Sequence, residues 1–219
     1  MPGKTKDITL TTEDKVTIAA TYYEAVSEKA VILLHMYGMT RQSWKEFAVF
    51  LQEKEYQAIA IDLRGHGQSL EKNKQKISYI NFHDQDFRDM TKDVKAAKKF
   101  LQQQGASDIS IVGASIGANL ALMMAAHDRE ITKVVALSPG LNYKGILTEP
   151  LMSNEISNKV LLVSSTGDVD SYGAVKLLKE KYQNSELMIF AGEGHGTDIL
   201  KNYKDSTDKV VNWLKGKLI

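Results

Sequence analysis

Short apolar runs recur along most of the chain, with polar or helical sequence between them. They cover residues 31–34, 58–61, 109–112, 134–137, 160–163 and 187–190. Runs that are apolar at nearly every position are typical of strands buried on both faces, as in a parallel sheet. Ahead of these runs, residues 7–12 and 16–23 are rich in Thr, Ile and Val and predict an antiparallel hairpin at one edge.

Segments with helical spacing alternate with the apolar runs. They cover residues 44–54, 82–104, 116–127, 173–182 and 197–217. In the second segment the apolar residues recur every three or four positions and share one helix face; they are Phe87, Met90, Val94, Ala97 and Leu101. Alternating strands and helices predict an α/β fold, with a doubly wound, mostly parallel sheet and helices on both faces. Its ligand site is expected beyond the carboxyl ends of the strands.

Two segments break this alternation. Residues 68–78 carry three lysines among other polar residues and predict a solvated surface loop. Residues 140–159 contain Pro150 and only scattered apolar residues. This segment is too short to form a second domain, and we expect one short helix there. We therefore expect residues 1–219 to form a single domain.

The composition excludes several classes of protein. Of the 219 residues, 43% are hydrophobic and 25% are charged, as in ordinary soluble globular domains. Lysine and arginine total 28 against 27 acidic residues, so the net charge of +1 provides no field that would attract nucleic acid or an anionic membrane. No run approaches the roughly 18 apolar residues of a membrane span, and no apolar segment follows the charged N-terminus, so we expect a cytoplasmic location. The absence of cysteine excludes disulfides, thiolate metal sites and a cysteine nucleophile.

A sharp turn between a strand and a helix carries the first chemical signal. Gly113, Ser115 and Gly117 form a G-x-S-x-G pattern that joins the apolar run 109–112 directly to an Ala- and Leu-rich helical segment. Such an elbow forces its serine into strained backbone geometry and exposes it, while side chains at the glycine positions would collide with the arms of the turn. The helix also directs its N-terminal amides toward whatever Ser115 attacks. The alternative is a tight turn with an incidental serine.

A serine nucleophile needs a base, and in elbow architectures the partners follow in the order Ser, acid, His. Three histidines precede Ser115, and His127 lies in the elbow's own helix. His195 remains, in a glycine-rich loop after the run 187–190, where the alternative is a surface histidine.

The acid should lie between the serine and the histidine. Asp168 follows the turn after the run 160–163 and is the preferred residue, with Asp170 as the alternative. The chosen carboxylate would hold one ring nitrogen of His195, so that the other accepts the Ser115 proton. The carboxylate that is not chosen would cap the following helix.

A developing oxyanion needs two backbone N–H donors. One comes from Ile116, directly after the nucleophile, and the other from the turn after the run 31–34. We expect Tyr37 to be this second donor, with Met36 as the alternative. Because the order of the triad argues against a catalytic role for His35, we expect His35 to brace the turn.

These residues together resemble the α/β-hydrolase superfamily, and in particular its small, lidless carboxylesterase-like serine hydrolases. Residues 62–69 are similar to the family's D-x-R-G-x-G-x-S segment, and residues 35–38 to its H-G-x-G turn, with Met36 where the family usually has glycine. The resemblance covers residues 30–217 and implies a sheet of about eight strands. It also implies that Arg64 and His66 are structural.

Many relatives insert a helical lid where this chain has only residues 140–159, so the resemblance implies a minimal or absent lid. Several apolar residues would then either line a substrate pocket or simply pack on the sheet; they are Met36, Met39, Leu141, Tyr143, Leu147, Leu151 and Met152.

The expected function is a serine hydrolase of the carboxylesterase type that cleaves small carboxylic esters through an acyl-enzyme on Ser115. His195 is expected to act as base, Asp168 to orient it, and the amides of Tyr37 and Ile116 to form the oxyanion hole. No metal or organic cofactor is expected, and the expected partner is a small-molecule ester. The formation of a homodimer is left open. The alternatives are a thioesterase, a lactonase or another acyl hydrolase on the same triad, and a non-catalytic binding module with a hydrolase-like fold.

Overall fold

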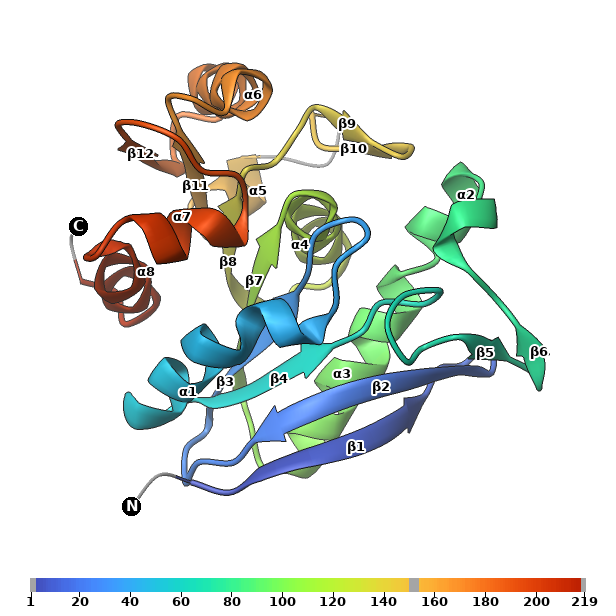
Figure 1. Ribbon diagram of the computed structural model, residues 1–219. Helices are drawn as coiled ribbons and strands as arrows, with labels where there is room; N and C mark the ends of the chain where they lie inside the picture. Colours follow the sequence, from blue (N-terminus) through green and yellow to red (C-terminus); the bar gives the residue numbers. More distant parts are fainter. Residues whose placement is uncertain (1–2, 150–153, 218–219) are drawn as a thin grey trace.

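The structure is a computed structural model that describes residues 3–149 and 154–217 (Figure 1). Over these residues, ten strands form one sheet in the order β12-β11-β8-β7-β3-β4-β2-β5-β6, with β1 paired to β2. The strands are β1 (Thr5–Thr11), β2 (Val16–Tyr23), β3 (Lys29–Leu34), β4 (Gln57–Ile61), β5 (Glu71–Lys72), β6 (Gln75–Lys76), β7 (Asp108–Ala114), β8 (Ile131–Leu137), β11 (Val160–Ser165) and β12 (Glu186–Phe190). Eight of them are long strands, and β5 and β6 are two-residue strands, so the predicted sheet is confirmed.

The apolar runs are the parallel part of the sheet. Strands β4, β3, β7, β8, β11 and β12 pair in parallel, whereas β2 pairs antiparallel with both β1 and β4. Every residue of β4 and β11 is buried, because both faces of these strands are covered. By contrast, most residues of the edge strand β1 are exposed, and only Leu10 near its end is buried. The predicted edge hairpin of β1 and β2 is confirmed.

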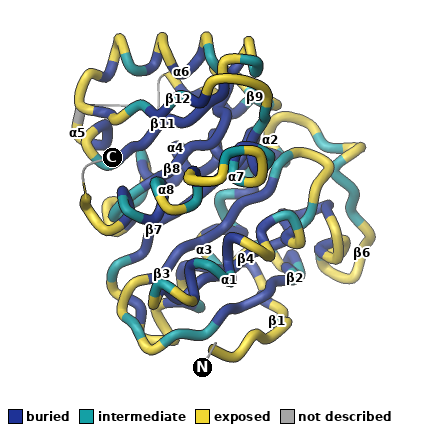
Figure 2. The backbone as a smooth tube through the Cα atoms, turned by 60° about the vertical axis from the view of Figure 1, so that its left-hand side comes forward, coloured by how far each residue is buried: buried dark blue, intermediate teal, exposed yellow. Residues whose placement is uncertain are grey.

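Helices cover both faces of the sheet (Figures 1 and 2). They are α1 (Lys45–Glu53), α2 (Asp84–Arg88), α3 (Thr91–Gln103), α4 (Ile116–His127), α5 (Asn154–Ser157), α6 (Val169–Lys181), α7 (Thr197–Asn202) and α8 (Ser206–Leu214), with 3-10 turns η1 (Arg41–Trp44) and η2 (Tyr79–Asn81). One apolar core joins the sheet to α3, α4 and α6, and a second joins it to α1, α7 and α8. Figure 2 shows the buried strands between helices that are buried on their inner sides and exposed on their outer sides.

Two segments predicted as single helices are each two helices, so these predictions were wrong at the break. Residues 82–104 divide into α2 and α3, and residues 197–217 into α7 and α8. At the first break the hydroxyl of Thr91 donates to the carbonyl of Arg88 at 3.0 Å, and at the second Ser206 donates to Tyr203 at 2.6 Å. In both places a side chain satisfies a carbonyl that a continuous helix would have bonded through its backbone.

Both irregular segments contain short antiparallel ribbons in addition to what was predicted. Strands β5 and β6 pair within the expected surface loop. After β8, strands β9 (Asn142–Tyr143) and β10 (Ile146–Leu147) form a hairpin ahead of the short helix α5. We call residues 140–148 the β9–β10 hairpin.

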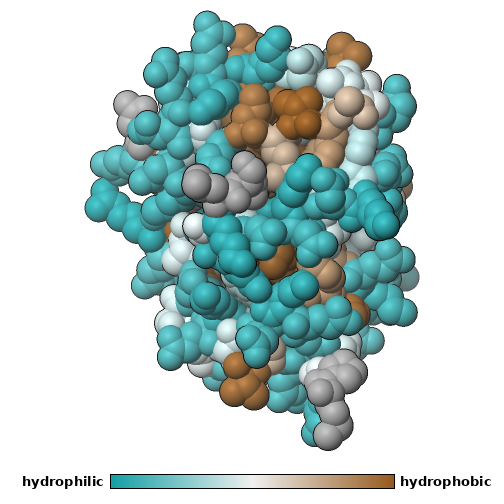
Figure 3. Space-filling view, turned by 90° about the vertical axis from the view of Figure 1, so that its left-hand side faces the viewer, coloured by the Kyte–Doolittle hydropathy of each residue, from teal (hydrophilic) through white to brown (hydrophobic). Residues whose placement is uncertain are grey.

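The surface is mostly polar. Figure 3 shows the face around α1 and α8 as largely hydrophilic, with apolar side chains gathered toward the α6 end of the molecule. Val169 and Leu177 of α6 are among the exposed apolar residues. Within residues 3–149 and 154–217, no helix combines the length and the hydropathy that crossing a bilayer requires.

Candidate active site

The register of the sheet brings the predicted site residues to one edge. Leu34 of β3 pairs with Gly113 of β7, and Ala114 of β7 pairs with Leu137 of β8. Further along, Ser165 of β11 pairs with Phe190 of β12. Because these strands are parallel and end at similar levels, the turns that follow them meet beyond their carboxyl ends.

Ser115 lies at a strained turn between β7 and α4. Its backbone has φ 54° and ψ −120°, a left-handed conformation that side chains rarely adopt, and its amide donates to the Leu137 carbonyl at 2.9 Å. A Cβ on Gly113 would lie 2.1 Å from the carbonyl oxygen of Gly117, and one on Gly117 would lie 2.4 Å from that of Leu34. The two glycines of the elbow are therefore required by the close approach of backbone to backbone.

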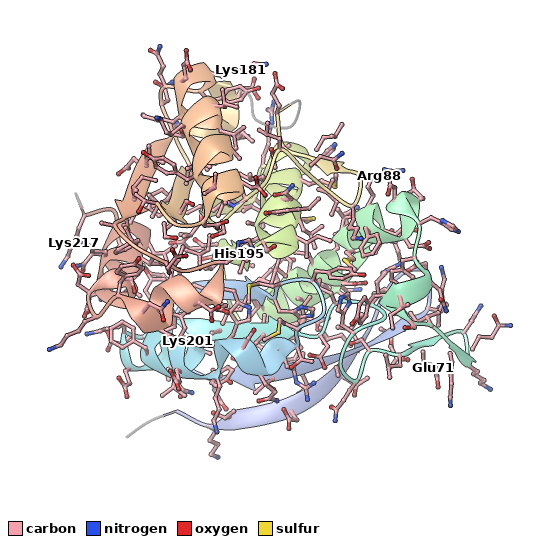
Figure 4. The ribbon with its side chains drawn as sticks, turned by 45° about the horizontal axis from the view of Figure 1, so that its top comes forward. Glu71, Arg88, Lys181, His195, Lys201 and Lys217 are labelled. Carbon is pink, nitrogen blue, oxygen red and sulfur yellow. The ribbon has the colours of Figure 1, made fainter. Side chains whose placement is uncertain are left out.

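His195 and Asp168 form a hydrogen-bonded pair. Nδ1 of His195 lies 2.8 Å from Oδ2 of Asp168, and since a carboxylate only accepts, the ring donates. The Asp168 side chain is 13% exposed and that of His195 40% exposed. Figure 4 shows His195 close to the middle of the view, near the start of α7. In its neutral form, His195 then has Nε2 as an acceptor.

The two candidate aspartates have different surroundings. Asp168 precedes α6 and makes no side-chain capping bond to that helix among the described residues, so its carboxylate serves His195 instead. Asp170 lies in the first turn of α6 and is exposed.

Two serines hold the backbone around His195, and sequence reasoning missed both. The hydroxyl of Ser138 accepts from the Gly196 amide at 2.9 Å, and the hydroxyl of Ser165 donates to the Gly194 carbonyl at 2.7 Å. Ser138 is fully buried and has φ 51°, a second left-handed residue at this edge of the sheet. The available signal was that Ser138 directly follows β8, which neighbours the elbow strand β7, and that Ser165 ends β11, the next strand along the sheet.

The turn after β3 is locked by His35. Its Nδ1 donates to the Met36 carbonyl at 2.7 Å, and its Nε2 accepts from the Leu63 amide at 3.0 Å. Burial, together with the neighbouring His66, lowers the pKa of His35 to about 4, so the ring is neutral at physiological pH. This is the bracing role predicted for His35. Tyr37, the expected oxyanion donor, lies at the tip of the turn.

Met36 lies beside the histidine loop. A Cβ on Gly196 would lie 2.5 Å from the sulfur of Met36 and 3.1 Å from Cβ of Ala114. Gly196 has φ 56° and also requires the absence of a side chain. The methionine that stands where the family usually has glycine thus lies against the histidine loop.

The segment of residues 62–69 forms a polar network beneath the site. Arg64 donates to Asp93 through Nε at 2.9 Å and to Asp14 through a terminal nitrogen at 2.8 Å. Asp62 accepts from the backbone amides of Arg41 at 2.7 Å and Gln68 at 2.9 Å. The segment's hydrogen bonds therefore connect strands and loops, as its resemblance to the family implies.

His66 belongs to the same segment and packs against its neighbours. Its Nδ1 lies 3.0 Å from the Arg64 carbonyl, and its ring stacks on Tyr79 with centroids 4.0 Å apart. Burial lowers the pKa of His66, so its ring also favours the neutral form.

The residues expected to line a substrate pocket have different surroundings. Tyr143 is half-buried and packs against the apolar core that includes α4. Met39 and Leu147 are exposed, and Leu141 lines a cavity of about 490 Å³ against α6 that neither Ser115 nor His195 lines. Met152 and Leu151 lie outside the described residues. Among the described residues, no group of three His, Cys, Asp or Glu is arranged to hold a metal ion.

Known proteins match both the sequence and the fold. The family model of the α/β-hydrolase fold matches residues 29–165, more than half of the chain. The chain belongs to the α/β-hydrolase fold family. The resemblance predicted from the elbow and from residues 35–38 and 62–69 is therefore confirmed. No curated protein sequence matches this α/β hydrolase.

Several solved structures share the fold of this α/β hydrolase. An esterase from Pyrococcus furiosus superposes with a TM-score of 0.76 at 22% identity, over 98% of this chain and 93% of the esterase. A predicted CIB-like hydrolase from Thermoplasma acidophilum has a TM-score of 0.73 at 19% identity, over 97% and 99% of the two chains. A highly thermostable carboxyl esterase from Bacillus coagulans has a TM-score of 0.73 at 11% identity, over 98% and 99%. At these identities the likeness establishes the architecture alone.

Proposed function

We propose that this α/β hydrolase is a serine esterase that cleaves small carboxylic esters through an acyl-enzyme on Ser115. The observation that carries the proposal is the Asp168–His195 hydrogen bond at the same sheet edge as the strained Ser115 elbow. An aspartate that holds Nδ1 of a histidine leaves Nε2 ready to take a proton, which is the arrangement a serine nucleophile needs. Solved structures with this fold include proteins described as esterases.

The proposed reaction has two halves. Oγ of Ser115 attacks the ester carbonyl carbon while Nε2 of His195 takes the hydroxyl proton, and the carbonyl oxygen becomes an oxyanion held by the amides of Ile116 and Tyr37. The intermediate collapses, and His195 returns its proton to the departing alcohol. A water molecule then attacks the acyl-enzyme with His195 again as base, which releases the acid and restores Ser115.

A small substrate fits the surroundings of the nucleophile. Ser115 is only 8% exposed. The short segment after β8 offers little apolar surface to a long acyl chain. Acetate or butyrate esters of p-nitrophenol should therefore be turned over faster than the dodecanoate ester, and faster turnover of the dodecanoate would contradict this substrate class.

The direct test is covalent labelling with a fluorescent organophosphonate, followed by intact mass measurement. The wild-type protein should gain one label and Ser115→Ala none. Ser107→Ala is the matched control, because Ser107 is an exposed serine just before the opposite end of β7, and it should label like the wild type. Folded wild-type protein without label would overturn the proposal and favour a non-catalytic binding module.

A further inference from the structure

The turn that carries the expected second oxyanion donor lies between β3 and η1. It comprises residues 35–40, and we call it the β3–η1 turn. Its middle is a β-turn, in which the Met39 amide donates to the Met36 carbonyl at 3.1 Å and Gly38 has φ 72°. The Tyr37 amide lies within this β-turn and donates to no carbonyl of the described residues. This N–H group is therefore available to an oxyanion.

The β3–η1 turn lies against the two other parts of the proposed site. Figure 1 shows it beside the start of α4, and a Cβ on Gly117 of the elbow would lie 2.8 Å from the carbonyl oxygen of His35. On its other side, a Cβ on Gly196 of the histidine loop would lie 2.5 Å from the sulfur of Met36. A shift of this turn would therefore move its available amide relative to the nucleophile.

Both ends of the β3–η1 turn are bound to the residues that follow β4. At the first end, Nε2 of His35 accepts from the Leu63 amide at 3.0 Å. Just beyond the other end, the backbone amide of Arg41 donates to Oδ1 of Asp62 at 2.7 Å, and Nη1 of Arg41 donates to Oδ2 of the same carboxylate. The last residues of β3 and β4 also pair with each other. The turn is thus anchored at both ends to two consecutive residues of a buried strand end.

The guanidinium of Arg41 is buried and has a partner at each of its three nitrogens. The side chain is only 6% exposed. Nε donates to the hydroxyl of Thr21 at 3.0 Å, and Nη2 donates to Oε1 of Gln68 at 2.8 Å, in addition to the bond between Nη1 and Asp62. Asp62 is 1% exposed and also accepts from the Gln68 amide at 2.9 Å. A planar group with three separate partners has one orientation, which the ammonium of a lysine does not reproduce.

The buried pair of Arg41 and Asp62 fixes geometry more than it adds stability. The loss of hydration of two buried charges offsets most of their attraction, so the pair itself contributes little net stability. Its hydrogen bonds are directional, however, and they join the backbone of the β3–η1 turn to the end of β4. The pair therefore determines where this end of the turn lies.

We propose that Arg41 is a positioning residue of the oxyanion hole: through Asp62 it holds the β3–η1 turn so that the Tyr37 amide meets the oxyanion. The inference rests on the proposed function, since the turn acts in the same reaction. Arg41 itself touches no reacting atom. A donor stabilises the oxyanion fully only when it is already oriented before the reaction, and a displacement of about 1 Å can lower a rate by about 100-fold.

A second buried arginine provides a matched control. Arg64 is 3% exposed and donates to Asp93 and to Asp14. Asp93 lies in α3 and Asp14 lies between β1 and β2, so these bonds do not reach the β3–η1 turn. Arg41→Lys and Arg64→Lys both keep a positive charge and both lose the fork of the guanidinium.

The test compares these two variants with the wild type on p-nitrophenyl acetate. Labelling with the fluorescent phosphonate counts the active sites, and kcat is expressed per labelled site. Arg41→Lys should lower this kcat by about 10- to 100-fold and leave KM within about threefold, because the misplaced donor acts in the transition state. Arg64→Lys should lower the urea midpoint of unfolding but keep kcat per labelled site within about twofold.

Two further measurements show which part of the site is affected. The affinity for phenylboronic acid, which forms a tetrahedral adduct with a serine, should fall together with kcat in Arg41→Lys. The pH dependence of kcat/KM should stay as in the wild type, because the bond between Asp168 and His195 is not altered. A merely structural role of Arg41 would reduce the number of labelled sites and leave the kcat and the boronic acid affinity of the remaining sites unchanged.

Gln68→Ala tests the same contact at an exposed position. This variant should fold, because Gln68 lies at the surface, but Nη2 of Arg41 loses its acceptor. We expect kcat per labelled site to fall by about two- to fivefold, together with the boronic acid affinity. Gln75→Ala, at an exposed glutamine of β6, is the control and should keep the wild-type values.

The outcomes separate this inference from the proposed function. Wild-type protein that neither reacts with the phosphonate nor hydrolyses the ester would overturn the proposed function itself. With active wild-type protein, an unchanged kcat per labelled site in Arg41→Lys would overturn the role of Arg41, and so would a fall in kcat without a fall in boronic acid affinity. If Arg41→Lys does not fold, Gln68→Ala decides: wild-type values overturn the inference, and a joint fall in kcat and boronic acid affinity supports it.

Discussion

Acid should destabilise this protein through His35 before most carboxylates protonate. The ring is fully buried, and both of its nitrogens are used, Nδ1 as a donor to Met36 and Nε2 as an acceptor from the Leu63 amide. A proton on Nε2 would point at a group that is itself a donor. Burial and the nearby His66 lower the pKa of His35 to about 4, against the opposing influence of Asp62.

The direction and size of this change in stability follow from the linkage between proton binding and folding. An unfolded histidine has a pKa near 6.5, so between about pH 6.5 and pH 4 the unfolded chain binds a proton at residue 35 that the folded protein does not. The stability that neutral His35 contributes is therefore complete above pH 6.5 and is lost as the pH falls toward 4. With these two values the free energy of unfolding should decrease by about 2 kcal/mol between pH 7 and pH 5 on account of His35.

Urea unfolding of the wild type and of His35→Gln at both pH values measures this contribution. The variant should be less stable at pH 7, because it loses the fitted hydrogen bonds, but its free energy of unfolding should fall by about 2 kcal/mol less than that of the wild type between pH 7 and pH 5. Leu51→Ala, in the buried face of α1, is the control for destabilisation alone and should keep the wild-type pH dependence. An equal fall in the wild type and in His35→Gln would refute the reasoning.

Four other substitutions test the site. Asp168→Asn should lower kcat for p-nitrophenyl acetate by about 10⁴-fold, because the histidine loses the partner that sets its tautomer, whereas Asp170→Asn should stay within about threefold of the wild type. Gly117→Ala should lower both the urea midpoint and kcat, since its Cβ would lie 2.4 Å from a backbone oxygen and overpacking costs about 1–3 kcal/mol. Ser138→Ala should lower kcat more than it changes KM, because the Gly196 amide next to His195 loses its acceptor; a change confined to KM would contradict this role.

The amino-acid pattern alone predicted the fold and the position of the elbow serine. Parallel strands covered on both faces must be apolar throughout, so the runs that became β3, β4 and β11 stand out without any knowledge of their neighbours. The signal for the elbow is equally local, because the serine and the two glycines that the sharp turn requires lie within five consecutive residues. The order of the triad then singled out His195 among five histidines.

Which side chains come into contact depends on the three-dimensional arrangement of the strands and loops. Asp168 and Asp170 are two residues apart, and the strand order and the path of the histidine loop determine that Asp168 hydrogen-bonds Nδ1 of His195. The hydrogen bonds of Ser138 with Gly196 and of Ser165 with Gly194 also join segments far apart in the chain. The spacing of hydrophobic residues indicates which face of a helix or strand is buried. It carries no information about which loops the register of a sheet brings together. For that physical reason the groups that would perform the chemistry were visible in the sequence, while those that hold them in place were not.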